Sequence, residues 1–292
     1  DDAINQHTKK RQALQQAKTA LMQRMFPQEG QTVPEMRLEG FDGEWEKTAM
    51  SNIASFSKGS GYSKNDFRAS GTPLFHYGRL YTNYQLAVTT VDTFAQMRPG
   101  STLSRGNEVL IPSSGETAED IATACALLQA GVILGGDLNI VRPKPDYDNV
   151  FLALSFSQGV TKAALEQKAQ GKTVVHIHNS DIRSLDVFIP PTLKEQQAIG
   201  AIFTNLDDAI NQHTKKHQAL QQAKTALMQR MFPQEEGQTV PELRLEGFDG
   251  EWKTTTLGEL GSFKSGVGFP EREQGGEAGL PLYLPLIHIS QP

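Results

Sequence analysis

Cysteine is almost absent from this sequence, in which Cys125 is the single one among 292 residues. One cysteine excludes a disulfide framework and any metal site built from several cysteines. Aromatic residues reach only 8%, and no apolar run approaches the roughly 18 residues that a membrane-spanning helix needs. No signal peptide is recognisable at the first residues. We therefore expect a soluble, cytoplasmic protein in which Cys125 is a small buried residue.

Sequence motifs for catalysis are also missing. The chain has no Gly-x-Ser-x-Gly nucleophile turn, no His-Glu-x-x-His pair, and no glycine-rich nucleotide fingerprint followed by an acidic residue. His176 and His178 share one face of a predicted strand, but no third metal ligand is evident nearby. We predict that this chain has no catalytic residues, no metal site and no cofactor of its own.

A long internal repeat is the strongest feature that is present. Residues 1–45 return as residues 207–252 with one inserted residue, Glu236, and two replacements. Arg11 corresponds to His217, and Met36 corresponds to Leu243. Repeats of a solenoid are short and numerous, so one long and nearly identical pair indicates a different organisation. The repeat predicts one variable domain placed between two copies of a spacer.

Each copy of the spacer begins with a predicted helix. Residues 1–26 contain no Pro or Gly, and the second helix is expected over residues 193–232. Apolar residues recur at seven-residue steps, which predicts a left-handed coiled coil that needs a partner helix. We interpret His213 as a polar seam residue that sets the helix register, not as a metal ligand. The predicted helix-pairing residues are Leu14, Leu21, Ile199, Ile202, Leu206, Ile210, His213, Leu220, Leu227 and Met231.

Between the spacer copies, residues 46–192 have the pattern of an α+β domain with a mixed, partly antiparallel sheet. Residues 27–45 and 233–252 are rich in Pro, Gly, Gln and Glu, which is typical of linkers. Within the domain, strands are expected at 86–88, 108–111 and 174–177, and helices at 149–165 and 118–128. Thr117 and Asp120 form the predicted capping box of the helix over 118–128.

Charge and loop composition in this domain indicate nucleic acid as a partner. Residues 47–105 carry seven bases and two acids, whereas residues 106–148 carry two bases and seven acids. The loops 58–64, 77–84 and 112–117 offer bases, hydroxyls and aromatic rings, which suit phosphates and base edges. Ordinary solvated loops are the alternative interpretation. The candidate DNA-binding residues are Lys58, Ser60, Tyr62, Lys64, Arg68, Tyr77, Arg79, Tyr81, Thr82, Arg105, Ser113 and Ser114.

The segment Ile189-Pro190-Pro191-Thr192-Leu193-Lys194-Glu195-Gln196-Gln197-Ala198-Ile199 resembles a known junction. It is similar to the point where a target recognition domain continues into a spacer helix in the specificity subunit of type I restriction–modification systems. Residues 77–82, 135–140 and 241–252 are similar to further stretches of that family. The resemblance covers nearly the whole chain and is strongest at the junctions.

The resemblance implies a non-catalytic subunit that reads one half of a split double-stranded DNA target. In that family, long antiparallel spacer helices hold methylation subunits, and restriction subunits join the complex. S-adenosylmethionine, ATP and Mg would be used by those partner subunits and not by this chain.

The sequence departs from the family pattern at both ends. It begins within a spacer helix, and residues 253–292 are too few to complete the second recognition domain that they begin. The tail 282–292 does not resemble the family's continuation. We therefore expect a truncated or half-subunit form with one complete recognition domain, whose helices pair within the chain or with a second copy.

Two other functions stay open at this point. One is a coiled-coil scaffold or interaction protein without DNA-reading activity, and the other is an enzyme of unrecognised class. Salt-dependent binding to DNA would exclude the scaffold, and the missing motifs argue against the enzyme.

Overall fold

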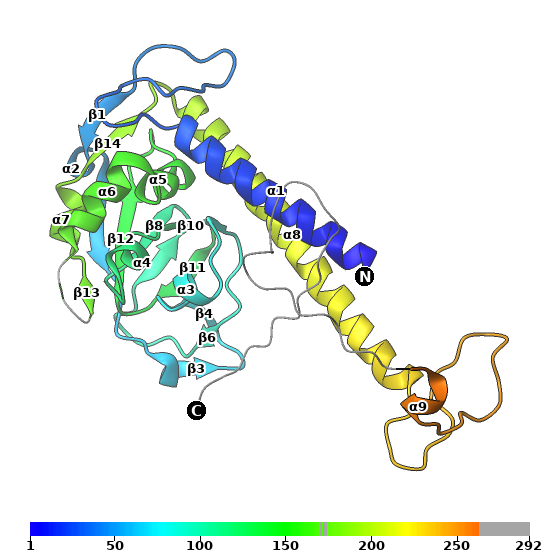
Figure 1. Cartoon of the computed structure of the whole chain (residues 1–292). Coiled ribbons are helices and arrows are strands. Elements are labelled where there is room, and N and C mark those ends of the chain that lie inside the picture. The colour runs from blue at the N-terminus through cyan, green and yellow to red at the C-terminus, as the bar shows by residue number, and fades with distance from the viewer. Residues whose placement is uncertain (170, 172–173, 263–292) are drawn as a thin grey trace. The chain divides into compact units, whose positions relative to one another are not determined.

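The computed structural model describes residues 1–169, 171 and 174–262 (Figure 1). The chain divides into two compact units, Asp1–Ala223 and Lys224–Pro292, and the division lies within one long helix. Most of the predicted second domain, with the tail 282–292, lies outside the described residues. None of the described helices combines the length and the hydropathy that crossing a bilayer requires.

The helices vary from single turns to one of 39 residues. In chain order they are α1 (Asp2–Arg24), α2 (Met50–Ile53), the 3₁₀ turn η1 (Lys64–Asp66), α3 (Arg79–Thr82), α4 (Ala118–Ile121), α5 (Asn149–Phe156), α6 (Gly159–Lys168), α7 (Asn179–Arg183), α8 (Leu193–Met231) and α9 (Leu257–Leu260).

The strands are short and lie between the two long helices in the sequence. They are β1 (Glu46–Ala49), β2 (Ala54–Lys58), β3 (Phe67–Arg68), β4 (Thr72–Phe75), β5 (Ala87–Val88), β6 (Phe94–Ala95), β7 (Leu103–Arg105), β8 (Glu108–Pro112), β9 (Ser114–Gly115), β10 (Cys125–Leu127), β11 (Ala130–Leu134), β12 (Leu138–Pro143), β13 (Val175–His176) and β14 (Asp186–Ile189).

Two five-stranded sheets organise the domain. The first has the order β2-β12-β8-β10-β5, and the second has the order β3-β6-β4-β11-β7. In each sheet one pair is parallel, β10 with β5 and β11 with β4, while the other pairs are antiparallel. The predicted α+β class with a mixed, partly antiparallel sheet is therefore confirmed.

The helix predicted over 118–128 is wrong beyond its first turn. The capping box at its start is present, because Thr117 Oγ1 accepts from Asp120 N at 3.0 Å and Asp120 Oδ2 accepts from Thr117 N at 3.1 Å. After Ile121 the chain leaves the helix, and Cys125–Leu127 become the buried strand β10. The sequence of a short apolar run does not show whether it forms a buried strand or a buried helix. Here pairing with β8 and β5 makes it a strand. Burial raises the pKa of the Cys125 thiol to about 12.

An aromatic cluster attaches both long helices to the domain. Phe26, just beyond α1, has its ring centroid 5.8 Å from Trp45, 5.7 Å from Phe151 of α5 and 6.3 Å from Phe203 of α8. All four side chains are buried in the larger hydrophobic core. The end of α1 and the first turns of α8 are therefore packed into the domain, which makes the domain and the two helix segments one body.

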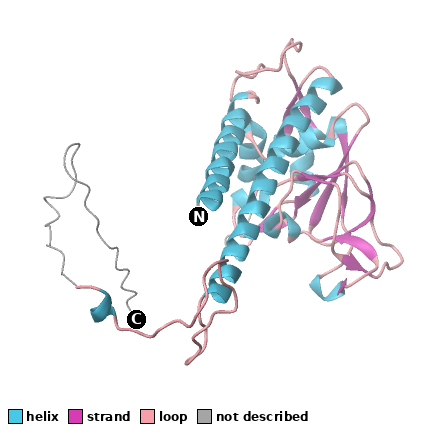
Figure 2. Cartoon of the chain, turned by 90° about the vertical axis from the view of Figure 1, so that its right-hand side faces the viewer, coloured by secondary structure: helices cyan, strands magenta, loops and turns pink. Residues whose placement is uncertain are grey.

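Figures 1 and 2 show α1 lying alongside α8, and the contacts make the pair antiparallel. Lys18 Nζ lies 2.5 Å from Asp207 Oδ1, while His7, earlier in α1, meets His213, later in α8. Among the predicted seam residues, Ile199 is buried, Leu227 is exposed, and the others are half-buried, namely Leu14, Leu21, Ile202, Leu206, Ile210, His213, Leu220 and Met231. In this structure α8 thus finds its partner helix within the same chain.

His7 and His213 occupy the same position in the two spacer copies, and the Nδ1 atoms of their rings lie 2.8 Å apart. In an antiparallel pair of like helices, a residue meets its own counterpart only near the local two-fold axis, so this pair marks the register. One ring must donate its Nδ1 proton and the other must accept it, which two imidazolium rings cannot do. The pKa of His7 is lowered by desolvation and by the positive charges of His213, Lys10, Lys216 and His217.

This pair predicts that helix pairing weakens in mild acid. A lowered pKa means that the unfolded chain binds protons that the paired helices do not, so stability rises with pH and its gain is complete above about pH 6.5. We expect the melting temperature to fall between pH 7.5 and pH 5.5, and to fall less in the double variant His7→Leu/His213→Leu. Circular dichroism melts at both pH values measure this, with His176→Asn, an exposed histidine, as control. Equal pH dependence in wild type and double variant would contradict the prediction.

Candidate functional site

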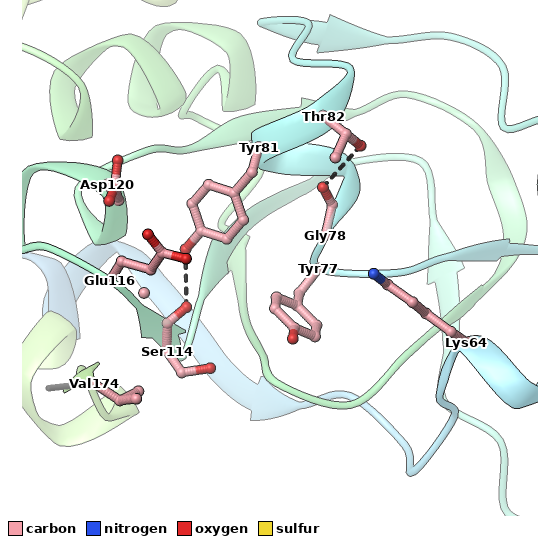
Figure 3. Close-up of a pocket in the computed structure, with 10 residues that line it drawn as sticks. Lys64, Tyr77, Gly78, Tyr81, Thr82, Ser114, Glu116, Asp120 and Val174 are labelled. Carbon is pink, nitrogen blue, oxygen red and sulfur yellow. Dashed lines mark hydrogen bonds between the residues drawn. The ribbon is translucent and has the colours of Figure 1, made fainter. Parts of the chain in front are cut away.

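A surface pocket of about 440 Å³ gathers several of the candidate DNA-binding residues (Figure 3). The region after β2, the turn of α3 and the segment from β9 to α4 form its walls. Its lining residues are Lys64, Tyr77, Gly78, Tyr81, Thr82, Ser114, Gly115, Glu116, Asp120 and Val174. Lys64, Tyr77, Tyr81, Thr82 and Ser114 come from the predicted set. Segments far apart in the sequence, such as those of Lys64, Ser114 and Val174, therefore meet here.

The turn of α3 presents Tyr77, Tyr81 and Thr82 to the pocket. His76 Nδ1 accepts from the Gly78 N–H at 3.1 Å, which starts the turn. Thr82 Oγ1 donates back to the Gly78 carbonyl at 3.0 Å, while Leu80 between them is buried in the core. The anchored Leu80 forces its neighbour Tyr81 outward, so the alternation of buried and exposed side chains in one short helical turn builds this wall.

The opposite wall comes from β9 and the start of α4. Tyr81 Oη donates to the Ser114 carbonyl at 2.9 Å and so ties the two walls together. Burial raises the pKa of Tyr81 well above its ordinary value, with a further contribution from the negative charge of Asp120. Tyr81 is therefore a neutral phenol at physiological pH. The wall also holds Glu116, which belongs to the predicted 112–117 loop and lies beside Tyr81 in Figure 3.

Arg79 is held inside the domain and does not line the pocket. Its guanidinium forms an ion pair with Asp92 at 2.6 Å and donates to Gln85 Oε1 at 2.9 Å. Its side chain is largely buried. The tyrosines and the arginine that alternate in the sequence therefore have different surroundings in the structure. Tyr77 and Tyr81 line the pocket, whereas Tyr84 donates to the Ala124 carbonyl and Arg79 holds the loop from inside the domain.

The loop 58–64 is held by Ser60 and Tyr62. Ser60 Oγ accepts from Thr102 N at 3.1 Å, and buried Tyr62 bonds Ser101 Oγ at 2.5 Å under the Arg98 guanidinium, which lies 4.0 Å from the ring centroid. Gly59 must be glycine, because a Cβ there would lie 1.7 Å from the Gly135 carbonyl oxygen. These contacts, together with the Ser63–Asp66 capping box at the start of η1, hold the loop 58–64 in place.

Lys58 and Ser113 contact each other away from the pocket lining. Lys58 Nζ donates to Ser113 Oγ at 2.7 Å. Desolvation lowers the pKa of Lys58, and the nearby carboxylates of Asp137 and Asp181 oppose that shift. Ser113 itself is buried, so its hydroxyl serves this internal contact.

Ion pairs within the domain engage several of the charges that were counted in the sequence. Lys47 pairs with Asp186, Arg98 pairs with Asp66, and Glu108, fully buried, pairs with Arg142. Lys64, Arg68 and Arg105 are exposed and form no ion pair with any described residue. Lys58 is exposed as well, but its Nζ donates to Ser113 Oγ, so Lys64, Arg68 and Arg105 are the exposed positive charges of the predicted set that have no side-chain partner among the described residues.

The same part of the chain offers no evident place for a metal ion. Among residues 1–169, 171 and 174–262, no three His, Cys, Asp or Glu side chains come together as a metal site. The pocket lining instead combines two phenol rings, hydroxyls, two carboxylates and one ammonium group. Such a set can form hydrogen bonds and stacking contacts with a ligand.

A curated protein resembles this chain over 68% of its length. A curated relative, the type I restriction enzyme MjaVIII specificity subunit of Methanocaldococcus jannaschii, is 21% identical over 200 residues, which are 68% of this chain and 45% of the relative. The chain thus spans about half the length of the curated relative that it matches.

Solved structures of specificity subunits also match over most of the chain. The HsdS subunit from Thermoanaerobacter tengcongensis has a TM-score of 0.49 and 14% identity, and the match covers 78% of this chain and 53% of that one. The type I restriction-modification S subunit from M. genitalium has a TM-score of 0.48 and 13% identity, covering 80% and 56%.

The family model described as the type I restriction modification DNA specificity domain matches residues 42–222. The matched region is more than half of the chain and runs from the end of the first linker through the seam of α8. It contains both five-stranded sheets and every residue that lines the pocket. The chain therefore belongs to the family of type I restriction modification DNA specificity domains.

Proposed function

We propose that this chain reads one half of a split double-stranded DNA target, with the pocket between α3, β9 and α4 as part of the reading surface. The observation that carries the proposal is the position of the pocket, whose whole lining lies within the region 42–222 that defines the family. Tyrosines and hydroxyls suit sugar, phosphate and base contacts. Lys64 lies in the pocket lining, and Arg68 and Arg105 are further exposed positive charges that suit phosphates.

The helices would serve as a spacer. Because the Phe26 cluster packs α1 and α8 into the domain, the orientation of the helices relative to the reading surface is defined within Asp1–Ala223. A rigid helix of known length sets the distance between two half-sites, as dimer geometry does in other DNA-binding proteins. We propose that methylation subunits bind along these helices and that restriction subunits join the same complex.

The second half-site would be read by another recognition domain. A second copy of this chain is one source, and a different specificity chain is the other. In this structure α1 occupies the seam of α8, so a second copy would have to exchange helices or use another face. A second copy would make the recognised sequence palindromic, whereas a different chain would make it asymmetric.

Selection of bound duplexes from a random DNA library tests the proposal. The purified chain should enrich one short motif, and the affinity for that motif should fall steeply as salt concentration rises. Enrichment of no motif, or binding that does not respond to salt, would refute DNA reading. That result would favour the scaffold function that the coiled coil alone would support.

Replacing Lys64 by glutamine should weaken binding to all DNA sequences about equally. If its ammonium group contacts one phosphate, the slope of log affinity against log salt should decrease by about 0.9. Fluorescence anisotropy across a salt series measures this slope. Lys47→Gln is the matched control, because Lys47 is exposed but already paired with Asp186 at 3.1 Å. An unchanged slope for Lys64→Gln would remove Lys64 from the DNA-contacting surface.

A further inference from the structure

The pocket contains more acidic side chains than a phosphate-binding site would have. Two carboxylates, Glu116 and Asp120, share it with a single ammonium group, that of Lys64. Asp120 is already engaged, because its Oδ2 accepts from the Thr117 N–H in the capping box. Glu116, in contrast, is exposed and makes no hydrogen bond or ion pair with any described residue. Its carboxylate is therefore available to a ligand.

Two of the hydroxyl groups that line the pocket, those of Tyr81 and Thr82, increase this acceptor character. Tyr81 gives its proton to the Ser114 carbonyl, and Thr82 gives its proton to the Gly78 carbonyl. A hydroxyl that has already donated can offer only its oxygen lone pairs to a ligand. Glu116, Tyr81 and Thr82 thus present acceptors, while Lys64 lies at the other side of the pocket in Figure 3. A ligand group that matches these acceptors must carry donors.

Among the base edges of DNA, only one suits a protein surface that offers hydrogen-bond acceptors and no donors. In the major groove cytosine offers its N4 amino group, whereas guanine and thymine offer acceptors and adenine places its N7 acceptor beside its amino group. A carboxylate near DNA is repelled by the phosphates, so it suits the interface only where it accepts a hydrogen bond from a base. The acceptor set therefore favours cytosine over the other three bases.

We propose that Glu116 reads the N4 amino group of a cytosine in the recognised half-site. This inference rests on the proposed DNA-reading function and adds a specificity-determining residue to it. Glu116 lies between β9 and α4, whose first turn is closed by the Thr117–Asp120 capping box. The capping box and the Tyr81–Ser114 hydrogen bond hold this loop, so the carboxylate is presented from a defined backbone.

The test compares motifs selected by the full-length wild type, Glu116→Gln and Glu119→Gln. The wild type should enrich a motif with one position fixed as cytosine. A glutamine can both donate and accept, as adenine requires, so Glu116→Gln should lose about tenfold or more of the cytosine preference at that single position. Glu119→Gln is the matched control, because Glu119 is an exposed glutamate of the neighbouring helix α4 but does not line the pocket.

A second measurement uses the selected site with that single C·G pair replaced by T·A. Thymine presents its O4 acceptor, so the wild type should bind this duplex about tenfold or more weakly, and Glu116→Gln should show a smaller difference. Equal thermal melting of wild type and variant shows that the fold is intact. If Glu116→Gln keeps the wild-type preference at every position, the cytosine inference is wrong while DNA reading stands. If the wild type selects no motif, DNA reading fails and the inference fails with it.

Discussion

Replacing Phe26 by alanine should lower the free energy of unfolding by about 3–5 kcal/mol, the range for a buried phenylalanine removed from a packed core. Phe26 is 5% exposed and contacts Trp45, Phe151 and Phe203, so its loss leaves a cavity where both long helices join the domain. The repeat supplies a matched control. Phe232 is the same residue of the second copy, but it is 45% exposed and contacts Trp252 edge to face, with 5.6 Å between the ring centroids.

Phe232→Ala should therefore change stability by only about 0.5 kcal/mol, the usual range for surface positions. Guanidinium unfolding followed by circular dichroism measures both variants, with the midpoint and the slope fitted separately. Phe26→Leu should recover part of the loss, because leucine fills some of the cavity. Equal destabilisation by the two alanine variants would mean that the second copy is packed as tightly as the first, which would contradict the structure.

Replacing Arg37 by methionine should lower the free energy of unfolding about as much as Phe26→Ala does, but for an electrostatic reason. The Arg37 guanidinium donates from Nε and Nη2 to the two carboxylate oxygens of Glu195 at 2.8 Å each, and Glu195 is only 1% exposed. It also donates to the Asp42 and Gly43 carbonyls, so the same side chain holds two later residues of the linker. Methionine keeps most of the side-chain volume but leaves a buried carboxylate unpaired. Such a loss costs about 3–5 kcal/mol.

The double variant Arg37→Met/Glu195→Gln separates the charge effect from loss of packing. Removing the buried charge as well should recover much of the stability, because the unpaired carboxylate is the main penalty. Arg244→Met is the control from the second copy, since Arg244 has no ion-pair partner among the described residues and should tolerate the change. No recovery in the double variant would show that Arg37 acts through the linker carbonyls instead.

Local structure followed from local sequence in the repeated spacer. In both copies the linker folds back on the helix end, where Met36 N donates to the Arg24 carbonyl and Leu243 N donates to the Arg230 carbonyl. The ion pairs Arg24–Glu35 and Arg230–Glu242 repeat as well, at 2.8 and 2.9 Å. These contacts join residues about a dozen apart, so the same short sequence makes them wherever it occurs.

Segments whose structure depends on distant partners were harder to predict. The apolar run at 125–127 reads equally well as helix or strand, and it became β10 because β8 and β5 lie on either side of it. Tyr62 and Tyr81 look alike as loop tyrosines. Tyr62 is buried beneath Arg98, whereas Tyr81 lines the pocket, because their neighbours in space come from other segments. The pocket itself joins loops from four stretches of sequence.

The sequence alone determined the long helices, the linkers, the α+β class and the capping box, because heptad spacing, Pro and Gly content and short-range hydrogen bonds are local properties. Tertiary structure alone decided which side chains are buried. Trp45 and Trp252 end nearly identical linkers, yet Trp45 lies in the core beside Phe151 and Trp252 is 41% exposed. Burial depends on what the rest of the chain brings to a residue, and two copies of one sequence cannot encode that difference.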